Sequence, residues 1–480
     1  MNKRMVAFFV GSVLKIEGLL MLFPLLVSIV YREREWVYIA ASAALCELVG
    51  FLLSRSKPKD NSFYTREGIV AVGLSWIILS VFGTLPYYQP GLPISFWDAL
   101  FETISGFTTT GASILTDVEA LPKGVLFWRS FTHWVGGMGV LVFVLAVMPM
   151  ASGENIYLMR AESPGPSVGK LLPKVKSTAK ALYLIYVAIT LVEIVILCFT
   201  GLSLFESCVV TFGCVGTGGF SIWASGCADY TMLQQAIITT FMIICGVNFN
   251  AYFFICRGKI KEAFSSEEVW AYLGIMGAAT LVVALNVRSY FTNFGQALHH
   301  SLFNVASVMT TTGFATTDFN LWPTFAKMVL LLVMFIGGCA GSTAGGIKVS
   351  RILVALKTIR KELEHFLHPR SVRVIRMENS PLDHSVLRGI NVYFMTYLVI
   401  FTSSIILVAL DGKDFTTTVT AVIATFNNIG PGLAMVGPYG GFSEFSVFAK
   451  GVLMFDMLAG RLELFPMLLI FMPATWKRQK

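Results

Sequence analysis

The stretch ALFETISGFTTTG, residues 99–111, is an apolar segment that ends in three threonines and a glycine. Three more segments align with it without gaps: SCVVTFGCVGTGG at 207–219, SLFNVASVMTTTG at 301–313 and TVTAVIATFNNIG at 418–430. Each segment closes on a run of small or polar residues before its glycine. Four copies of one pattern, each placed between two long apolar stretches, indicate a chain built from one unit repeated four times.

The composition is that of a membrane protein. Of the 480 residues, 55% are hydrophobic and 13% are charged, and the mean hydropathy is +0.71. A soluble domain carries about 25% charged residues. Apolar runs such as 69–85 and 125–148 are long enough to approach or complete a crossing of the hydrocarbon core as helices. This pattern excludes a soluble enzyme with a large core.

The basic residues report topology rather than binding to nucleic acid. The net charge is +8, but nucleic acid would need a soluble basic face, and none is predicted. Loops rich in Lys and Arg lie on the cytoplasmic side of a membrane, so both termini are expected in the cytoplasm. The basic segments are 3–4, 55–66, 160–180, 257–261, 348–388 and 477–480.

The helices expected from this pattern begin with a hairpin over 5–30 and 36–54. Four units follow, each with a spanning helix, a short half-helix, a turn and a second spanning helix. The fold class expected is an all-α polytopic membrane protein with four tandem helix–pore-loop–helix repeats in a pseudo-fourfold, K⁺-channel-like arrangement. The expected pairs of spanning helices are 68–86 with 122–149, 178–200 with 229–256, 269–288 with 322–347, and 388–410 with 447–472. The expected units are the hairpin at 1–60 and the repeats at 61–150, 151–262, 263–380 and 381–480.

The repeated loops have the chemistry of a cation site. Each apolar run before the closing turn has about ten residues, too few to cross the bilayer. Its carboxyl end carries partial negative charge, and glycine lets the next residues turn their carbonyls inward. Rings of such carbonyls replace the hydration shell of K⁺. The alternative, ordinary helix caps or small-residue helix contacts, does not explain why a short helix precedes every loop.

A glycine-rich stretch interrupts the apolar run before the basic segment 348–388. Five glycines among the ten residues 337–346 would cost roughly 1 kcal/mol each in a helix, so a helix broken near mid-membrane is expected. A phosphate-binding loop is excluded, because Lys348 is followed by Val349 rather than Ser or Thr and no strand precedes the stretch. Tight packing of small residues stays open as an alternative.

Arg461 lies in the middle of the apolar stretch 447–472. A central arginine costs at least ~2.5 kcal/mol to insert, so it should face the bundle interior or water. On a continuous helix, Asp456 and Glu463 would lie on other faces. Arg461 therefore either lines the path of an ion or pairs with a group on another helix.

Other reactive residues give no sign of an enzyme. The eight cysteines form no Cys-x-x-Cys pair, and a disulfide between Cys214 and Cys227 is conceivable but disfavoured. His133, His299 and His300 have no companions at metal-ligand spacing, so packing roles are expected. No nucleophile–base pair or catalytic pair of acids is present.

The four loops, the glycine-rich stretch near Gly341, Gly432 and Arg461 together resemble the Trk/Ktr/HKT potassium transporter superfamily, and within it the TrkH/TrkG-type membrane subunit. The resemblance covers essentially the whole chain, and the initial hairpin is of the TrkH type. It implies that one chain forms a pore with a selectivity filter made by its four loops. Glycine at all four closing positions favours K⁺ over Na⁺.

The resemblance also assigns residues. The implied filter residues are Thr109, Thr110, Gly111, Thr217, Gly218, Gly219, Thr311, Thr312, Gly313, Asn428, Ile429 and Gly430, with K⁺ held at Thr109, Thr110, Gly218, Thr311, Thr312 and Asn428. The implied gating residues are Gly341, Ser342, Thr343, Gly345, Gly346 and Arg461.

The resemblance further implies a homodimer in the bacterial cytoplasmic membrane and a cytosolic nucleotide-binding regulatory subunit of the TrkA type docked near 348–388. Membrane lipids are equally suitable partners for that basic segment. No covalent cofactor is expected, and any nucleotide would bind to the regulatory partner. A secondary transporter with alternating access, coupled to H⁺ or Na⁺, is the rival class. The parallel orientation of the repeats favours a channel-like path. A purely structural scaffold is the third possibility.

Overall fold

The computed structural model describes residues 3–55, 65–89, 92, 94–139, 175–370, 374–378 and 380–476. Within these ranges the chain is helical except for loops and one short antiparallel pair, β1 (Arg376–Met377) and β2 (Ser380–Pro381). Six of its helical segments are long and apolar enough to span a membrane, or seven with one bent pair included. The predicted all-α polytopic fold is confirmed.

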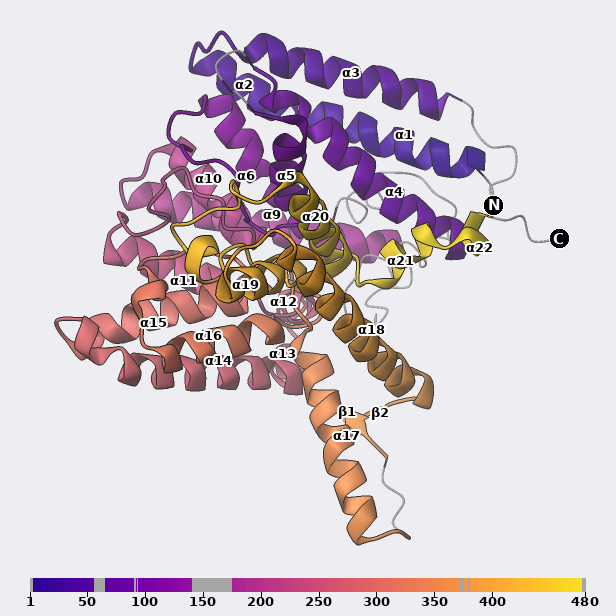
Figure 1. The fold of residues 1–480 in the computed structure, drawn as a ribbon, viewed down its shortest axis with the longest axis vertical. Coiled ribbons are helices and arrows are strands. Elements are labelled where there is room, and N and C mark those ends of the chain that lie inside the picture. The colour runs from indigo at the N-terminus through magenta and orange to yellow at the C-terminus, as the bar shows by residue number, and fades with distance from the viewer. Residues whose placement is uncertain are drawn as a thin grey trace.

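The chain begins with the predicted hairpin. α1 (Lys3–Leu20) continues into α2 (Leu22–Val30), and α3 (Trp36–Ser54) returns beside α1, as Figure 1 shows. The two helices meet at glycines: a Cβ on Gly11 would lie 2.7 Å from the carbonyl oxygen of Gly50. Small residues at such contacts let membrane helices approach closely. The same hairpin covers α4 (Thr65–Gly83), the first helix of the first repeat.

Four units of outer helix, short helix and inner helix follow. They are α4, α5 (Phe96–Phe107) and α6 (Lys123–Gly137); α9 (Val175–Phe199), α10 (Leu204–Val215) and α11 (Met232–Cys245); α14 (Glu267–Asn286), α15 (Phe294–Met309) and α16 (Thr324–Ile336); and α18 (His384–Ala409), α19 (Phe415–Phe426) and α20 (Val447–Arg461). The 3-10 turns η1 (Leu85–Tyr87), η2 (Arg288–Tyr290), η3 (Phe319–Leu321) and η4 (Ala434–Val436) lie in the loops between them.

Each short helix begins at a side-chain cap. Ser95, Ser203, Asn293 and Asp414 each accept a hydrogen bond from the backbone N–H three residues on, which satisfies one of the free donors at a helix start. After the first turn α5, α10 and α19 are almost entirely buried, and so is the carboxyl half of α15, whereas α18 buries five of its 26 residues. The short helices therefore form the core, and the outer helices α9 and α18 expose most of their surface, whereas α4 is covered by the hairpin.

The inner helices differ from the prediction. Continuous helices were expected over 229–256 and 447–472, and both expectations are wrong. α11 ends at Cys245 and α12 (Phe249–Cys256) leaves it at an angle of 91°. α20 ends at Arg461, where Glu463 and Leu464 adopt left-handed conformations before α21 (Phe465–Phe471).

The other two inner helices also stop early. α6 ends at Gly137, and the rest of the expected span 122–149, from residue 140 on, lies outside the described residues. α16 ends at Ile336, followed by Gly337 with φ 74°, which confirms the predicted break in the third repeat. The inner helices α11, α16 and α20 are therefore interrupted, and α6 has 15 residues in the described part of the chain. This explains why fewer helices than the ten expected pass the length criterion for a span.

The remaining helices lie toward one end of the molecule. α13 (Ile260–Phe264) follows α12, and α22 (Pro473–Trp476) follows α21. α17 (Val349–Leu367) extends away from the bundle with β1 and β2 beside it (Figure 1). The basic segment 348–388 thus begins buried in the bundle at Lys348, and its helix α17 projects away from it.

The contact between α1 and α3 gives a stability prediction. Gly11→Val would place new atoms against Gly50, Leu53 and Ser54, so we expect a loss of ~1–3 kcal/mol from overpacking and a lower thermal unfolding midpoint in detergent. The matched control is Gly274→Val in α14, where a Cβ meets nothing within 4 Å. Equal midpoints for the two variants would contradict the close contact.

Candidate functional site

The four repeated loops share one backbone conformation. Each short helix is followed by a residue in the left-handed region, at φ values of 54–56°: Thr109, Thr217, Thr311 and Asn428. The next N–H bonds back to the last turn of the helix, from Thr110 to Ser105 at 2.9 Å and at 2.8 Å in the other three loops. This is the Schellman closure of a helix. Threonine is β-branched and rarely takes positive φ, whereas asparagine takes it more readily, so the first three loops hold a strained conformation at this site.

The closing glycines join the four loops into a ring. A Cβ on Gly111 would lie 2.0 Å from the Gly218 oxygen, and one on Gly219 would lie 1.9 Å from the Thr312 oxygen. A Cβ on Gly313 would lie 2.2 Å from the Ile429 oxygen, and one on Gly430 would lie 2.7 Å from the Thr110 oxygen. The loops therefore follow one another in chain order and close on the first. All four glycines have φ between 76° and 97°, so both space and conformation require glycine.

The backbone carbonyls of the ring are unpaired among the residues that the structure describes. In the described part of the chain, no hydrogen bond reaches the carbonyl oxygens of residues 109–111, 217–219, 311–313 and 428–430. Buried carbonyls in folded proteins are nearly always paired. Oxygens left free in the centre of a membrane bundle are suited to contact water or a cation.

Some side chains of the ring are held by hydrogen bonds, and others are buried without a hydrogen-bond partner among the described residues. The Thr110 hydroxyl bonds to Thr108 at 2.8 Å and accepts from Asn428 Nδ2 at 3.0 Å, and Thr312 bonds to Thr310 at 2.8 Å. Thr109 Oγ1 and Asn428 Oδ1 are buried without a hydrogen-bond partner among the described residues. The ring thus offers backbone oxygens along its length and two further side-chain oxygens.

Loop 2 has glycine where the other loops carry a side chain. A Cβ on Gly218 would lie 2.2 Å from the Cγ atom of His133. The His133 ring packs on Phe220, and its Nδ1 lies 2.8 Å from the Gly106 oxygen. The imidazole therefore fills the space of the missing side chain and packs behind the ring.

The other candidate side chains have structural contacts. His299 Nε2 lies 2.8 Å from Gln235 Oε1, and His300 Nδ1 lies 3.0 Å from Thr316 Oγ1. No cluster of three or more His, Cys, Asp or Glu suited to a metal occurs among the described residues. Cys214 and Cys227 are both free and buried, so the conceivable disulfide is not formed.

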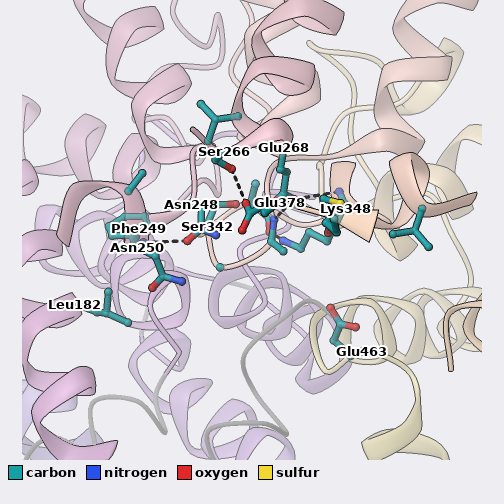
Figure 2. A pocket seen from close by; sticks show the side chains of 18 of the residues that line it. Leu182, Asn248, Phe249, Asn250, Ser266, Glu268, Ser342, Lys348, Glu378 and Glu463 are labelled. Carbon is teal, nitrogen blue, oxygen red and sulfur yellow. Dashed lines mark hydrogen bonds between the residues drawn. The ribbon is translucent and has the colours of Figure 1, made fainter. Parts of the chain in front are cut away.

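Hollows lie on the two sides of the ring. The outer one has a volume of about 270 Å³ and is lined by the four closing glycines. The inner one, of about 590 Å³, is lined by Gly341, Ser342, Gly345, Gly346 and Arg461. Figure 2 shows that Asn248, Glu268 and Lys348 also surround the inner cavity. The ring and the glycine-rich stretch therefore separate two cavities, each large enough to hold water molecules.

The glycine-rich loop 337–346 lies directly against the inner side of the ring. Gly345 N donates to Thr311 Oγ1 at 2.6 Å, and Gly346 N donates to the Asn427 oxygen at 3.1 Å. A Cβ on Gly345 would lie 2.5 Å from that same oxygen. The loop thus touches the third and fourth repeats immediately below the ring.

Arg461 joins the loop to the ends of other inner helices. Its guanidinium donates to the Thr343 oxygen at 2.9 Å, to Gly136 at 2.6 Å and to Gly137 at 2.7 Å. Thr343 Oγ1 in turn donates to the Cys245 oxygen at 3.2 Å. The carboxyl ends of α6, α11 and α20 are therefore connected through the loop and Arg461.

The two acids near Arg461 in sequence are engaged elsewhere. Asp456 accepts from Ser404 at 2.6 Å, and Glu463 forms an ion pair with Arg351. The sequence argument placed Glu463 on another face of a continuous helix, and that reason is wrong because the helix ends at Arg461. The left-handed turn at Glu463 directs it toward α17.

Sequence reasoning missed Glu268, in the first turn of α14. Its Oε1 accepts from Ala340 N at 2.7 Å and from Ser350 N at 3.0 Å, so one carboxylate anchors both the glycine-rich loop and the first turn of α17. In the sequence, Glu267 and Glu268 have the pattern of ordinary acids at a helix start. No local signal links them to a loop about 70 residues away.

A bundle of four repeats, with short buried helices converging on a ring of free carbonyls, defines a polytopic membrane protein of the pore-loop class. The chain belongs to the TrkH family of cation transport proteins, whose sequence model matches residues 36–478. Proteins of this family are transporters and not enzymes.

Relatives match the chain over nearly its whole length. The Trk system potassium uptake protein TrkH of Escherichia coli K12 is 34% identical, over 99% of this chain and 100% of its own. The Trk system potassium uptake protein TrkG of the same strain is 30% identical, over 99% of each chain. The crystal structure of the potassium transporter TrkH from Vibrio parahaemolyticus superposes with a TM-score of 0.90 at 33% identity, over 99% of this chain and 100% of that chain.

The ring contacts predict a sharp effect of one methyl group. Gly219→Ala puts a Cβ 1.9 Å from the Thr312 oxygen, so we expect cation flux in proteoliposomes to fall at least about tenfold, equivalent to ~1.4 kcal/mol. The control is Gly201→Ala, which has φ 96° but open space around its Cβ. Equal flux in the two variants would contradict the ring.

Proposed function

We propose that this protein takes up K⁺ across the bacterial cytoplasmic membrane through the ring formed by its four loops. The observation that carries the proposal is the closed set of backbone carbonyls without protein partners, flanked by hollows on both sides. The relatives named as potassium uptake proteins support K⁺ as the transported ion.

The proposed selectivity filter is made of the three closing residues of each loop. Carbonyls held by the ring replace the water around K⁺, and the carboxyl ends of α5, α10, α15 and α19 add partial negative charge. Within the filter, K⁺ binds at Thr109, Thr110, Gly218, Thr311, Thr312 and Asn428. The unpartnered oxygens of Thr109 and Asn428 support ion contacts at the inner end.

Below the filter, the proposed gate consists of the glycine-rich loop and Arg461. Gly341, Ser342, Thr343, Gly345 and Gly346 form a backbone segment pressed against the ring. The positive charge of Arg461, held at Thr343, repels a cation that leaves the filter. Opening requires the loop to move from under the third and fourth repeats.

The cellular setting extends the proposal. We place both termini in the cytoplasm, divide the chain into a hairpin at 1–60 and repeats at 61–150, 151–262, 263–380 and 381–480, and expect a homodimer. The segment 348–388, which includes the projecting α17, carries the basic surface for a TrkA-like nucleotide-binding regulatory subunit or for anionic lipids. K⁺ is the only ion or cofactor that the proposal requires in this chain.

The first test is transport by the purified chain. In proteoliposomes loaded with K⁺ and diluted into K⁺-free buffer, we expect tracer Rb⁺ to be taken up. External K⁺ should compete strongly with Rb⁺ and Na⁺ only weakly, because the filter selects K⁺ over Na⁺ without a second ion. Uptake should persist without any H⁺ or Na⁺ gradient. Uptake that requires such a second gradient would instead support a coupled symporter with alternating access.

The gate gives a second test. Arg461→Ala removes a charge near the ion path, and a unit charge ~4 Å away costs ~1 kcal/mol even in water, so Rb⁺ uptake should rise about fivefold. The control is Arg288→Ala in the exposed turn η2, which should behave as wild type. Unchanged uptake by a monodisperse Arg461→Ala protein would refute the barrier, and loss of folded protein would assign Arg461 a structural role.

A further inference from the structure

A buried ion pair lies behind the outer end of the ring. Glu102 in α5 and Arg129 in α6 are 2.6 Å apart, and their side chains are 0% and 4% exposed. Charges are costly to bury in a membrane protein and usually serve function. The transport mechanism proposed above does not use either residue.

Glu102 anchors the chain that leaves the first loop. Its two oxygens accept from Ser113 Oγ at 3.0 and 3.1 Å, and its Oε2 accepts from Ile114 N at 3.0 Å. Ser113 and Ile114 follow Gly111 directly after Ala112. The carboxylate therefore fixes the outgoing strand of loop 1 to its own short helix.

Arg129 anchors the chain that leaves the second loop. It donates to the Ser221 oxygen at 2.9 Å, and its guanidinium lies 3.5 Å from the centre of the Phe220 ring. Phe220 and Ser221 follow Gly219. Loops 1 and 2 are neighbours in the ring. The ion pair therefore connects the two chain segments that leave these loops on the outer side.

The Glu102–Arg129 ion pair occurs only on the side of the ring formed by loops 1 and 2, among the aligned positions. At the positions aligned with Glu102, the other loops have Val210, Asn304 and Ala421. Their outgoing strands use neutral contacts, such as Ser307 Oγ to the Phe314 oxygen at 2.5 Å and Leu433 N to Thr420 Oγ1 at 3.0 Å. Only the first two loops are held by a charged pair among these aligned positions.

Arg129 also faces the path of the ion. Among the described residues lining the outer hollow, it is the one with a charged side chain. A positive group at the mouth of a cation path lowers the local cation concentration unless an acid offsets it. Glu102 lies behind Arg129 at hydrogen-bond distance and supplies that negative charge.

We propose that the Glu102–Arg129 pair determines cation specificity by fixing the spacing of loops 1 and 2 at the outer end of the ring, while its acid cancels the charge that Arg129 presents to the vestibule. Both residues act as positioning groups, through the strands they hold. The proposal rests on the K⁺ uptake function proposed above.

The experiment measures Rb⁺ uptake in proteoliposomes and the K⁺ and Na⁺ concentrations that halve it. Glu102→Gln keeps the shape of the side chain but removes its charge. We expect lower uptake and a preference for K⁺ over Na⁺ that is reduced at least about tenfold, equivalent to ~1.4 kcal/mol. Arg129→Lys keeps the charge but loses the planar guanidinium that reaches Ser221 and stacks on Phe220. The preference for K⁺ over Na⁺ should therefore fall, with a smaller loss of uptake than in Glu102→Gln.

The matched control is Lys450→Gln, which breaks a second ion pair of α5, with Asp98 at 2.7 Å, away from the outgoing strands of loops 1 and 2. It should keep the wild-type preference. A folded Glu102→Gln protein with wild-type preference would overturn the proposal. If that variant does not fold, wild-type preference in Arg129→Lys would overturn it instead. A wild-type protein without K⁺-selective uptake would refute the proposed function itself.

Discussion

The structure depends on backbone carbonyls in the middle of a membrane bundle that no described residue pairs by a hydrogen bond. In hydrocarbon, a peptide group without a partner costs several kcal/mol, so such groups persist only where an ion or water meets them. Three residues in each of four loops present carbonyls in this state. The short helices, the left-handed residues and the closing glycines are the means by which one chain holds them together.

Much of the surrounding structure fixes this ring in place. Side-chain caps start each short helix, and a Schellman closure ends it. Threonine hydroxyls bond back to their own helix or to each other, as Thr110 does with Thr108. His133 fills the space beside Gly218, and the Glu102–Arg129 pair holds the strands outside. Because each contact acts on backbone position, small changes here should alter which ion fits.

The sequence predicts the ring better than the region below it. A run of small or polar residues that closes on glycine repeats after each short apolar segment, as TTTG in loops 1 and 3, so the four loops and their glycines follow from local chemistry, whereas the sequence leaves the register of loops 2 and 4 open by one residue. The breaks in α11 and α20 do not follow from it, because 229–256 and 447–472 are each largely apolar and of spanning length, despite Asn248 in the first and Arg461 and Glu463 in the second. At the break in α11 the free backbone groups find partners in a distant segment: the Gly246 oxygen accepts from Cys339 N, and Phe249 N donates to the Gly341 oxygen. Such pairing between repeats leaves no periodic signal in either segment. Glu268 was missed for the same reason, whereas the break at Gly337 could be predicted because glycine itself marks it.

The most direct test is to locate the ion. A crystal structure of the protein grown in Rb⁺ or Tl⁺, with anomalous data, should show peaks on the axis of the ring beside the carbonyls of Thr110, Gly218, Thr312 and Ile429. The peaks should weaken when K⁺ is added and persist when Na⁺ is added. A ring that holds no ion at concentrations that saturate uptake, or ions bound only elsewhere, would contradict the account.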